Sequence, residues 1–382
     1  MLQFVRLAKP VLVLIAETAL FYTFTIGQQY YNVAPGIEHV EIIKTISGLA
    51  VRINILRVNP KMARVDVVHA KDAVIGAETT SSISRRWQAT AAINGGFFRL
   101  DKSLYLGEPA GVLQIDGKLL SDSVNDRAAL LINNAGRTHL KFARIRTTTT
   151  LILGRKKFRV SGINRELKKD EIIIFTPEFH PTVLSDSETL LVSVSNSLIK
   201  RVARGEANFR IPCNGFVIAA KGQKAEEILA QIKKSKRAAV VSNIEQVDAA
   251  ANKLVFKAED ITNGASLLVK DGSPDLTFEA EKISKSFAET RHPRTAAAVT
   301  KNGEILFVTV DGRSESSGGI SLKDLADFLI SLGAVDAINL DGGGSTTMVI
   351  QGKVVNQPSD KEGERAIGDA IIIRSRGRKI SN

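Results

Sequence analysis

The stretch from Arg291 to Arg374 constrains the fold of this 382-residue chain more than any other part of it. Apolar strands are expected over residues 295–300 and 304–310, on either side of the turn-forming pair Asn302-Gly303. Ser321 has the pattern of a helix N-cap, which predicts a helix to about Leu332 with Gly333 as its stop. After the helix, the pattern predicts a strand over 335–340, the loop Asp341-Gly342-Gly343-Gly344-Ser345, a hairpin turning at Gln351-Gly352 and a last strand over 370–373.

This order of strand, loop, helix and strand predicts a crossover between parallel strands. Asp311 and Asp341 would then follow the C-terminal ends of two parallel strands, on one rim of the sheet. Open α/β sheets usually bind their ligands at such a rim. We therefore expect an α+β or α/β fold, with mixed β-sheets, packed helices and an active rim at the C-terminal ends of parallel strands.

The remainder of the chain contributes further strands and one helix. Alternating patterns predict strands over 51–56 and 63–69, and Asp116-Gly117 predicts a hairpin between 111–115 and 118–121. Residues 140–160 are basic and β-rich, as in a solvated sheet face, and 225–234 have helical spacing. Since no linker is visible, residues 28–88 are interpreted as strands joined to the core, 89–374 as one catalytic domain and 375–382 as a basic tail.

The N-terminus predicts the compartment. Arg6 and Lys9 precede an apolar run from Val11 to Gly27 that only Glu17 interrupts. Basic residues before such a run are typical of an export signal, cleaved after Gly27, or of a retained membrane anchor. A buried core helix is the lesser alternative. We expect an extracytoplasmic protein, periplasmic or secreted, with residues 1–27 as the segment that would associate with the inner membrane.

Composition narrows the classes of partner. Lys and Arg number 52 against 40 Asp and Glu, a net charge of +12, which favours anionic partners. Aromatic residues make up only 5%, too few to make a stacking surface for nucleic acid the first choice. The single cysteine, Cys213, excludes an intrachain disulfide and a Cys-rich zinc site, and it is expected to be a small core residue. The five histidines lack zinc-site spacing, although His292 lies next to Arg294 in the motif-bearing block.

Several elements of that block can support chemistry on an anionic substrate. Three glycines after Asp341 allow close approach of the backbone and present N–H groups to an anion. Their spacing fits neither a nucleotide-binding P-loop nor a dinucleotide-binding fingerprint. Arg294, Arg313 and Arg365 can donate to phosphate oxygens, and two carboxylates on one rim suit glycosidic cleavage. Asp-Gly pairs are also common in turns, so a structural role for Asp311 stays open.

Five motifs in order resemble those of the phosphodiester glycosidase family. They are Asn94-Gly95-Gly96-Phe97-Phe98, Arg291-His292-Pro293-Arg294-Thr295-Ala296, Asp311-Gly312-Arg313, Asn339-Leu340-Asp341-Gly342-Gly343-Gly344-Ser345-Thr346 and Glu364-Arg365-Ala366-Ile367-Gly368-Asp369. The resemblance covers roughly 89–373 and is thinner in the middle, where it rests on Gly162-Ile163-Asn164-Arg165 and Phe175-Thr176-Pro177. The family includes the uncovering enzyme, N-acetylglucosamine-1-phosphodiester α-N-acetylglucosaminidase, and bacterial envelope and exopolysaccharide proteins. This chain lacks the cysteine-rich appendage of the animal enzyme, which points to the bacterial envelope type.

The resemblance implies hydrolysis of a glycosyl-1-phosphodiester to a free sugar and a phosphomonoester. It implies catalytic roles for Asp341, Asp311 and His292, with the order of the two carboxylates unassigned. Arg294 and Arg365 would clamp the phosphate, and Asn94, Gly95 and Gly96 would form the facing wall of the sugar pocket. The other substrate-binding residues that it implies are Thr295, Gly312, Arg313, Asn339, Gly342, Gly343, Gly344, Ser345 and Asp369. No cofactor or metal is required, although Asp311 and Asp341 can hold a hard cation such as Ca²⁺.

Two other readings remain open. A non-catalytic envelope protein that binds anionic glycan would keep the fold without turnover. Nucleic-acid binding rests on net charge alone and lacks a motif, so we expect a sugar-phosphate or anionic glycan partner and no nucleic acid.

Overall fold

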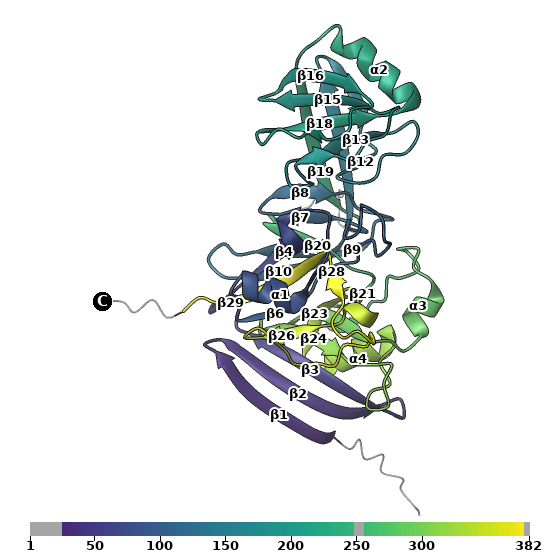
Figure 1. Cartoon of the computed structure of the whole chain (residues 1–382). Helices are drawn as coiled ribbons and strands as arrows, with labels where there is room; N and C mark the ends of the chain where they lie inside the picture. Colours follow the sequence, from purple (N-terminus) through teal and green to yellow (C-terminus); the bar gives the residue numbers. More distant parts are fainter. Residues whose placement is uncertain (1–24, 248–255, 378–382) are drawn as a thin grey trace, which may run out of the picture.

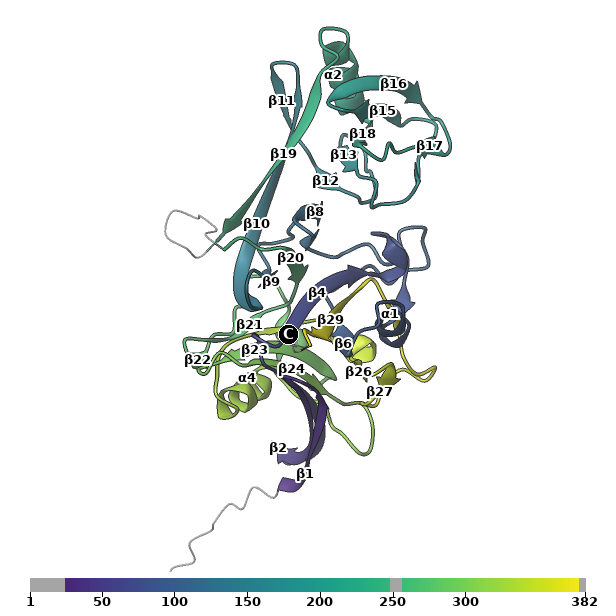
Figure 2. The same cartoon turned by 90° about the vertical axis from the view of Figure 1, so that its left-hand side faces the viewer.

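The computed structural model describes residues 25–247 and 256–377. Two β-sheets stacked face to face form the larger part, and an elongated arm (residues 139–246, from the start of β10 to the end of β19) rises from it (Figures 1 and 2). The predicted signal or anchor, residues 1–27, lies outside the described residues except for its last three, which begin strand β1. No helix within 25–247 and 256–377 is long and apolar enough to cross a membrane.

The larger sheet has eight strands in the order β1-β2-β3-β24-β23-β25-β21-β22. Their bounds are β1 Thr25–Ala34, β2 Ile37–Ile46, β3 Leu49–Val58, β24 Ile305–Val310, β23 Arg294–Thr300, β25 Ala334–Asn339, β21 Leu267–Lys270 and β22 Ser273–Pro274. All six residues of β24 are buried, as expected for a strand that is covered on both faces.

The second sheet has five strands in the order β27-β26-β6-β29-β4. Their bounds are β27 Lys353–Val354, β26 Met348–Ile350, β6 Ala91–Asn94, β29 Asp369–Ser375 and β4 Ala63–His69. Side chains from both sheets, including Leu56, Ile93, Phe307 and Ile371, share one buried core, so the two sheets form a sandwich.

Two helices cover the outer faces of the sandwich. Helix α4 (Leu322–Ser331) packs Leu325 and Leu329 against the eight-stranded sheet, and its N-cap Ser321 accepts from the Asp324 N–H. Helix α1 (Thr80–Arg86) packs Ile83 against the five-stranded sheet. The predicted cap and stop of α4 are therefore confirmed, because both depend on local sequence.

A third sheet joins the sandwich to the arm. It contains β11-β10-β9-β20-β7-β8, with β19 also paired to β10. Their bounds are β11 Lys156–Arg159, β10 His139–Leu153, β9 Ala128–Asn133, β20 Asp260–Asn263, β7 Leu113–Ile115, β8 Lys118–Ser121 and β19 Ala238–Gln246. The predicted Asp116-Gly117 hairpin is confirmed, since both residues have positive φ and join β7 to β8.

The far end of the arm holds a small sheet covered by helix α2 (Gly222–Ile232). The sheet has the order β12-β13-β18-β15-β16, with bounds β12 Gly162–Ile163, β13 Ile172–Phe175, β18 Gly215–Ala220, β15 Leu190–Ser195 and β16 Leu198–Arg204. Other short elements of the described chain are β5 Glu78–Thr79 with β28 Ala366–Ile367, β14 Thr182–Val183 with β17 Phe209–Arg210, helix α3 Lys285–Glu289, and 3₁₀ turns at Ala70–Asp72 and Gly343–Ser345.

The predicted fold class is wrong. Residues 25–247 and 256–377 are mostly β, with 48% strand and 11% helix, and every described strand pair except β12 with β13 is antiparallel. The reason is strand β23, which forms a hairpin with β24 and also pairs with β25, so that it lies between the two strands of the predicted crossover and is antiparallel to both. Because both are antiparallel to β23, β24 and β25 still run in the same direction, with one strand between them.

Cys213 also departs from its expected place. Its side chain is exposed in the connection between β17 and β18, so it is not a core residue.

Candidate active site

The five sequence motifs come together at one end of the sandwich. Asn94 ends β6, Asp311 follows β24, Asp341 lies two residues after β25, and Asp369 begins β29. These segments are far apart in sequence, and both sheets contribute to them. The antiparallel arrangement therefore gathers the motifs at one edge, which we call the motif rim (residues 94–96, 292–295, 311–313, 339–347 and 364–369).

Asn94 ties three of these segments together. Its Nδ2 donates to the Asp341 carbonyl oxygen at 2.7 Å. Its Oδ1 accepts from the Thr295 hydroxyl at 2.7 Å and from the Thr347 N–H at 3.2 Å. Since Asn94 is only 1% exposed, water does not compete for these bonds, and the side chain fixes the backbone around Asp341.

Asp341 has a strongly perturbed environment. Burial, with a smaller contribution from the charge of Asp369, raises the pKa of its carboxyl group to about 6. The Ser345 hydroxyl, the Gly342 N–H, which donates to Oδ1 at 2.9 Å, and the charge of Arg365 oppose that rise. A carboxyl group with a pKa near neutrality can both donate and accept a proton, as general acid–base chemistry requires.

Asp369 faces the same place from the other sheet. The Gly96 N–H donates to its two carboxylate oxygens at 3.2 and 3.3 Å, and the Thr262 hydroxyl donates to Oδ2 at 2.8 Å. Burial raises the pKa of this carboxyl group as well. Asp369 is thus close enough for its charge to act on Asp341, whereas the sequence predicts Asp311 as the second carboxylate beside Asp341.

The glycines of the rim are required by close approaches. A Cβ on Gly95 would lie 2.3 Å from the Asp369 Oδ2, and one on Gly96 would lie 2.6 Å from the Thr262 hydroxyl. A Cβ on Gly344 would lie 2.1 Å from the Arg365 Nη2. Gly95 and Gly96 also lie against backbone oxygens, so close packing requires glycine at these two positions independently of a ligand.

The rest of the glycine loop follows the same rule. A Cβ on Gly342 would lie 2.7 Å from the Pro293 carbonyl oxygen, and Gly343 has a φ of +59°. Gly312 packs against Gly319, where a Cβ would lie 2.8 Å from the Gly319 Cα.

Buried polar atoms without partners lie beside this loop. Among the described residues, the hydroxyls of Thr346 and Thr347 and the Oδ1 of Asn339 are buried and make no hydrogen bond. The Asn339 Nδ2 donates to the carbonyl oxygens of Ala265 and Leu340, so this side chain points into the protein. Unsatisfied polar atoms are rare in folded proteins, and each one calls for a structural or functional explanation.

Asp311 lies on the same rim but faces a different segment. Its Oδ1 accepts from the Asn356 Nδ2 at 3.0 Å, and the Gln357 N–H donates to both oxygens at 3.2 and 3.1 Å. Burial raises its pKa to about 6. The carboxylate therefore holds the segment that follows β27, and with β23 between their strands Asp311 and Asp341 are separated by roughly 10 Å of sheet.

The three arginines have three different environments. Arg294 is 1% exposed, and its guanidinium donates to the carbonyl oxygens of Phe287, Thr290 and Ile320. Burial lowers its pKa to about 10. It holds the chain around helix α3 and does not point toward open space at the rim.

Arg365 forms a bidentate ion pair with Asp360: its Nε donates to Oδ2 at 2.7 Å and its Nη2 donates to Oδ1 at 2.9 Å. The pair lies directly over Gly344. Arg313 is exposed, and its Nη2 lies 3.3 Å from the His292 Nδ1. Burial, together with the charges of Arg294 and Arg313, lowers the pKa of His292. Arg313 is thus the rim arginine that remains available to an anionic ligand, with His292 beside it.

A cation bridging Asp311 and Asp341 does not fit these residues. Both oxygens of Asp311 already accept hydrogen bonds, and one strand separates the two carboxylates. Within 25–247 and 256–377, no group of three or more His, Cys, Asp or Glu side chains is arranged to hold a metal ion.

Four residues at the rim were not identified from the sequence: Thr262, Asn356, Gln357 and Asp360. Each of them lies in a segment that has no sequence motif, and each forms a hydrogen bond or ion pair with a motif residue. The thinner part of the resemblance, which includes Asn164 and Thr176, lies in the arm. There the Asn164 Nδ2 donates to the Thr176 hydroxyl and its Oδ1 accepts from the Thr176 N–H, so these residues have a structural role.

Comparison with known proteins shows what this chain is similar to. Residues 188–374 match the model of the family described as phosphodiester glycosidase. The SPbeta prophage-derived protein YomE of Bacillus subtilis is 38% identical over 106 residues, which is 28% of this chain and 16% of that protein. The N-acetylglucosamine-1-phosphodiester alpha-N-acetylglucosaminidase of Bos taurus is 42% identical over 109 residues, 26% of this chain and 20% of that enzyme. The matched part of the chain thus spans a fifth or less of the length of these curated relatives.

Two solved structures share the fold over most of the chain. A hypothetical protein from Synechocystis matches 92% of this chain and 64% of its own, with a TM-score of 0.77 and 24% identity. A protein from Burkholderia pseudomallei that is described as exported matches 85% of this chain and 74% of its own, with a TM-score of 0.74 and 25% identity.

Proposed function

Because the chain carries a phosphodiester glycosidase family domain, with distant homology to the mammalian enzyme and to YomE, we propose that it hydrolyses a glycosyl-1-phosphodiester. In this reaction a water oxygen bonds to the anomeric carbon and the bond from that carbon to the phosphate oxygen breaks. The products are a free sugar and a phosphomonoester, and the proton of the water passes to a base in the site. An envelope glycan or exopolysaccharide is the substrate class that we propose.

The observation that carries this proposal is the environment of Asp341. Its carboxyl group has a pKa of about 6, Asn94 holds its backbone, and Asp369 lies opposite. We propose Asp341 as the group that transfers the proton, with its burial, and to a smaller extent the charge of Asp369, keeping its pKa high. Such a group typically contributes about 10²–10⁴-fold to the rate.

The other rim residues support binding in this proposal. Arg313, which is exposed at the rim, would hold the phosphate. Asp311, Arg294 and Arg365 would act as positioning residues, because hydrogen bonds within the protein already occupy them.

An extracytoplasmic location completes the proposal. It is supported by the basic and apolar pattern of residues 1–27 and by the exported Burkholderia relative. Cleavage of a signal and retention of an anchor are equally compatible with this pattern.

The test is release of free sugar and phosphomonoester from a panel of glycosyl-1-phosphodiesters, with the Asp341→Asn variant measured beside the parent. We expect turnover by the parent, and loss of turnover with retained ligand affinity in the variant. Binding of donors without turnover by the parent would favour the non-catalytic glycan-binding protein. Equal turnover by parent and variant would refute the role of Asp341.

A further inference from the structure

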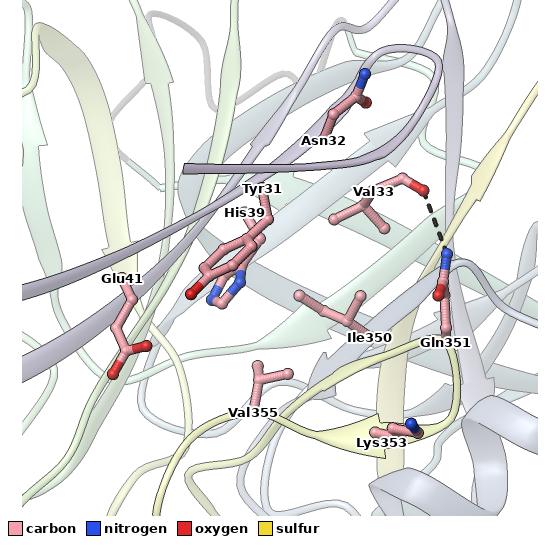
Figure 3. Close-up of a pocket in the computed structure, with 9 residues that line it drawn as sticks. All are labelled: Tyr31, Asn32, Val33, His39, Glu41, Ile350, Gln351, Lys353 and Val355. Atoms are coloured by element: carbon pink, nitrogen blue, oxygen red, sulfur yellow. Dashed lines mark hydrogen bonds between the residues drawn. The ribbon is translucent and has the colours of Figure 1, made fainter. Parts of the chain in front are cut away.

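A cavity of about 590 Å³ lies outside the motif rim, between strands β1 and β2 and the β26–β27 hairpin (Figure 3). Tyr31, His39 and Glu41 line it from the strands, and Gln351, Lys353 and Val355 line it from the hairpin. None of the five sequence motifs contributes to this lining. Its volume is that of a site for a small molecule or one or two sugar rings.

One wall is a rigid aromatic pair. The rings of Tyr31 and His39 stack at 5.5 Å with an interplanar angle of 18°. His39 is 6% exposed, and its Nε2 is hydrogen-bonded with the Asn54 Oδ1 at 2.9 Å, so the ring beneath Tyr31 is fixed. Tyr31 itself remains 47% exposed, although a large aromatic side chain is normally buried.

The remaining walls alternate polar and apolar groups. Ile350 and Val355 present methyl groups, Gln351 presents an amide, and Lys353 presents an ammonium group. The Gln351 Nε2 donates to the Val33 carbonyl oxygen at 3.3 Å and links the hairpin to β1 (Figure 3). A sugar ring has apolar C–H faces and a circumference of hydroxyls, so it matches an aromatic wall surrounded by amide and charged groups.

Two segments connect residues of the cavity lining to Asp311 at the rim. Val355 precedes Asn356 and Gln357, which donate hydrogen bonds to Asp311. On the other side Glu41 pairs with Arg52 at 3.3 Å, and the Arg52 carbonyl oxygen accepts the Asp311 N–H at 3.0 Å. Residues of the cavity lining are thus linked to both segments that hold Asp311.

We infer that this cavity is a subsite for a sugar unit of a glycan chain that continues from the scissile phosphodiester. This inference rests on the proposed function and deepens it, since it makes the substrate an oligosaccharide or polysaccharide phosphodiester. Lys353 has no carboxylate partner among the described residues, and it stands where a phosphate or another acidic group of that chain would lie.

The experiment compares two adjacent tyrosines. Tyr31 lines the cavity, whereas Tyr30 is 63% exposed and, as the preceding residue of strand β1, points to the opposite face. Binding of defined tetrasaccharides, including chitotetraose, cellotetraose and maltotetraose, is measured by calorimetry for the parent, Tyr31→Ala and Tyr30→Ala. We expect at least one of them to bind the parent and Tyr30→Ala equally, and to bind Tyr31→Ala about tenfold more weakly.

A second variant protects the test against misfolding. Gln351→Ala, on the opposite wall, should also weaken binding of the same tetrasaccharide. It replaces Tyr31→Ala in the test if that variant does not fold. Lack of binding by the folded parent, or equal binding by all variants, would overturn the subsite.

Activity separates this inference from the proposed function. If short donors are hydrolysed but the tetrasaccharides do not bind, the subsite is refuted and the function stands. If the tetrasaccharides bind through Tyr31 but no donor is hydrolysed, the function fails and the cavity stands as a glycan-binding site.

Discussion

The motif rim and the arm differ in where their charged groups lie: those of the rim are buried, whereas the arm carries most of the net positive charge. At the rim, Asp311, Asp341 and Asp369 are hydrogen-bonded by the protein, and burial raises their pKa values. The arm holds 20 of the 52 Lys and Arg residues against 10 of the 40 Asp and Glu residues, so it carries +10 of the net charge of +12. Charges that are buried and fixed suit chemistry, whereas exposed charges act at long range and are screened by salt.

The largest expected effect comes from a matched pair of buried asparagines. Asn94 at the rim and Asn164 in the arm are 1% and 0% exposed, and each makes three side-chain hydrogen bonds. Replacing either should cost about 2–3 kcal/mol of stability, because buried partners are left unsatisfied. Asn94→Ala should also lower kcat/KM by about 10²-fold, since it releases the backbone of Asp341.

Asn164→Gly is the control, with glycine chosen because Asn164 has a φ of +53°. Its kcat/KM per folded molecule should match the parent, as measured by steady-state kinetics with the folded fraction from circular dichroism. Equal losses of activity in both variants would show that the rim and the arm are not separable.

The pH dependence of stability should have opposite signs in the two regions. The pKa of Asp341 is raised to about 6, so its folded carboxyl group binds a proton more readily than the unfolded chain does. Its stabilising contribution is greatest below pH 4 and is lost as the pH rises through 6. The free energy of unfolding of Asp341→Asn should therefore exceed that of the parent by about 2 kcal/mol at pH 7.5, and by little at pH 4.

Asp186 in the arm is the counterpart. The hydrogen bond from Lys221 lowers its pKa, so its contribution is present above pH 4 and is lost as the pH falls. Asp186→Asn should lower Tm at pH 7.5 and have little effect at low pH. Differential scanning calorimetry at pH 4, 5 and 7.5 measures both variants, and shifts of the same sign would contradict the contrast.

The sequence predicted features that depend on neighbouring residues. The cap and stop of α4 and the Asp116-Gly117 and Asn302-Gly303 turns are local, and the structure has them where the pattern predicted. The parallel sheet was wrong because the insertion of β23 between β24 and β25 is a nonlocal choice of partners.

The same distinction applies to the candidate site. The motifs named the residues that gather at the rim, but not their partners in space. The charge of Asp369, a residue of another motif, acts on Asp341. Arg294 is buried against the carbonyl groups of Phe287, Thr290 and Ile320, which belong to segments without any motif. Side-chain direction depends on these contacts and cannot be read from spacing.

A smaller effect is expected at the outer end of the arm. Eight exposed cations there form what we call the basic tip, and none has a carboxylate partner within the described part of the chain: Arg155, Lys156, Lys157, Lys200, Lys233, Lys234, Lys236 and Arg237. Backbone bonds from Gly154 to Arg237 and from Ile199 to Lys236 hold their loops together. Exposed like charges of this kind attract polyanions in a salt-dependent way.

Binding to long-chain polyphosphate should weaken, and depend less on salt, when four lysines of the tip are replaced by Gln: Lys156, Lys157, Lys234 and Lys236. The assay measures this binding between about 50 and 200 mM NaCl. Turnover of a short donor should stay within about twofold, since the tip is remote from the rim. Replacing the exposed Lys61, Lys102, Lys301 and Lys361 is the control with equal charge loss. Equal weakening in both sets would assign the binding to net charge rather than to the tip.

The smallest effect is expected at Cys213, the only cysteine of the chain. Because its thiol is exposed in the arm, iodoacetamide should modify the folded protein completely, and Cys213→Ser should change stability by no more than about 0.5 kcal/mol. Mass spectrometry measures the modification, and the donor assay measures turnover before and after it. A thiol that reacts only after unfolding would contradict its exposed position. A loss of turnover on modification, in contrast, would show that a change confined to the arm reaches the rim, and would break the separation between the two regions.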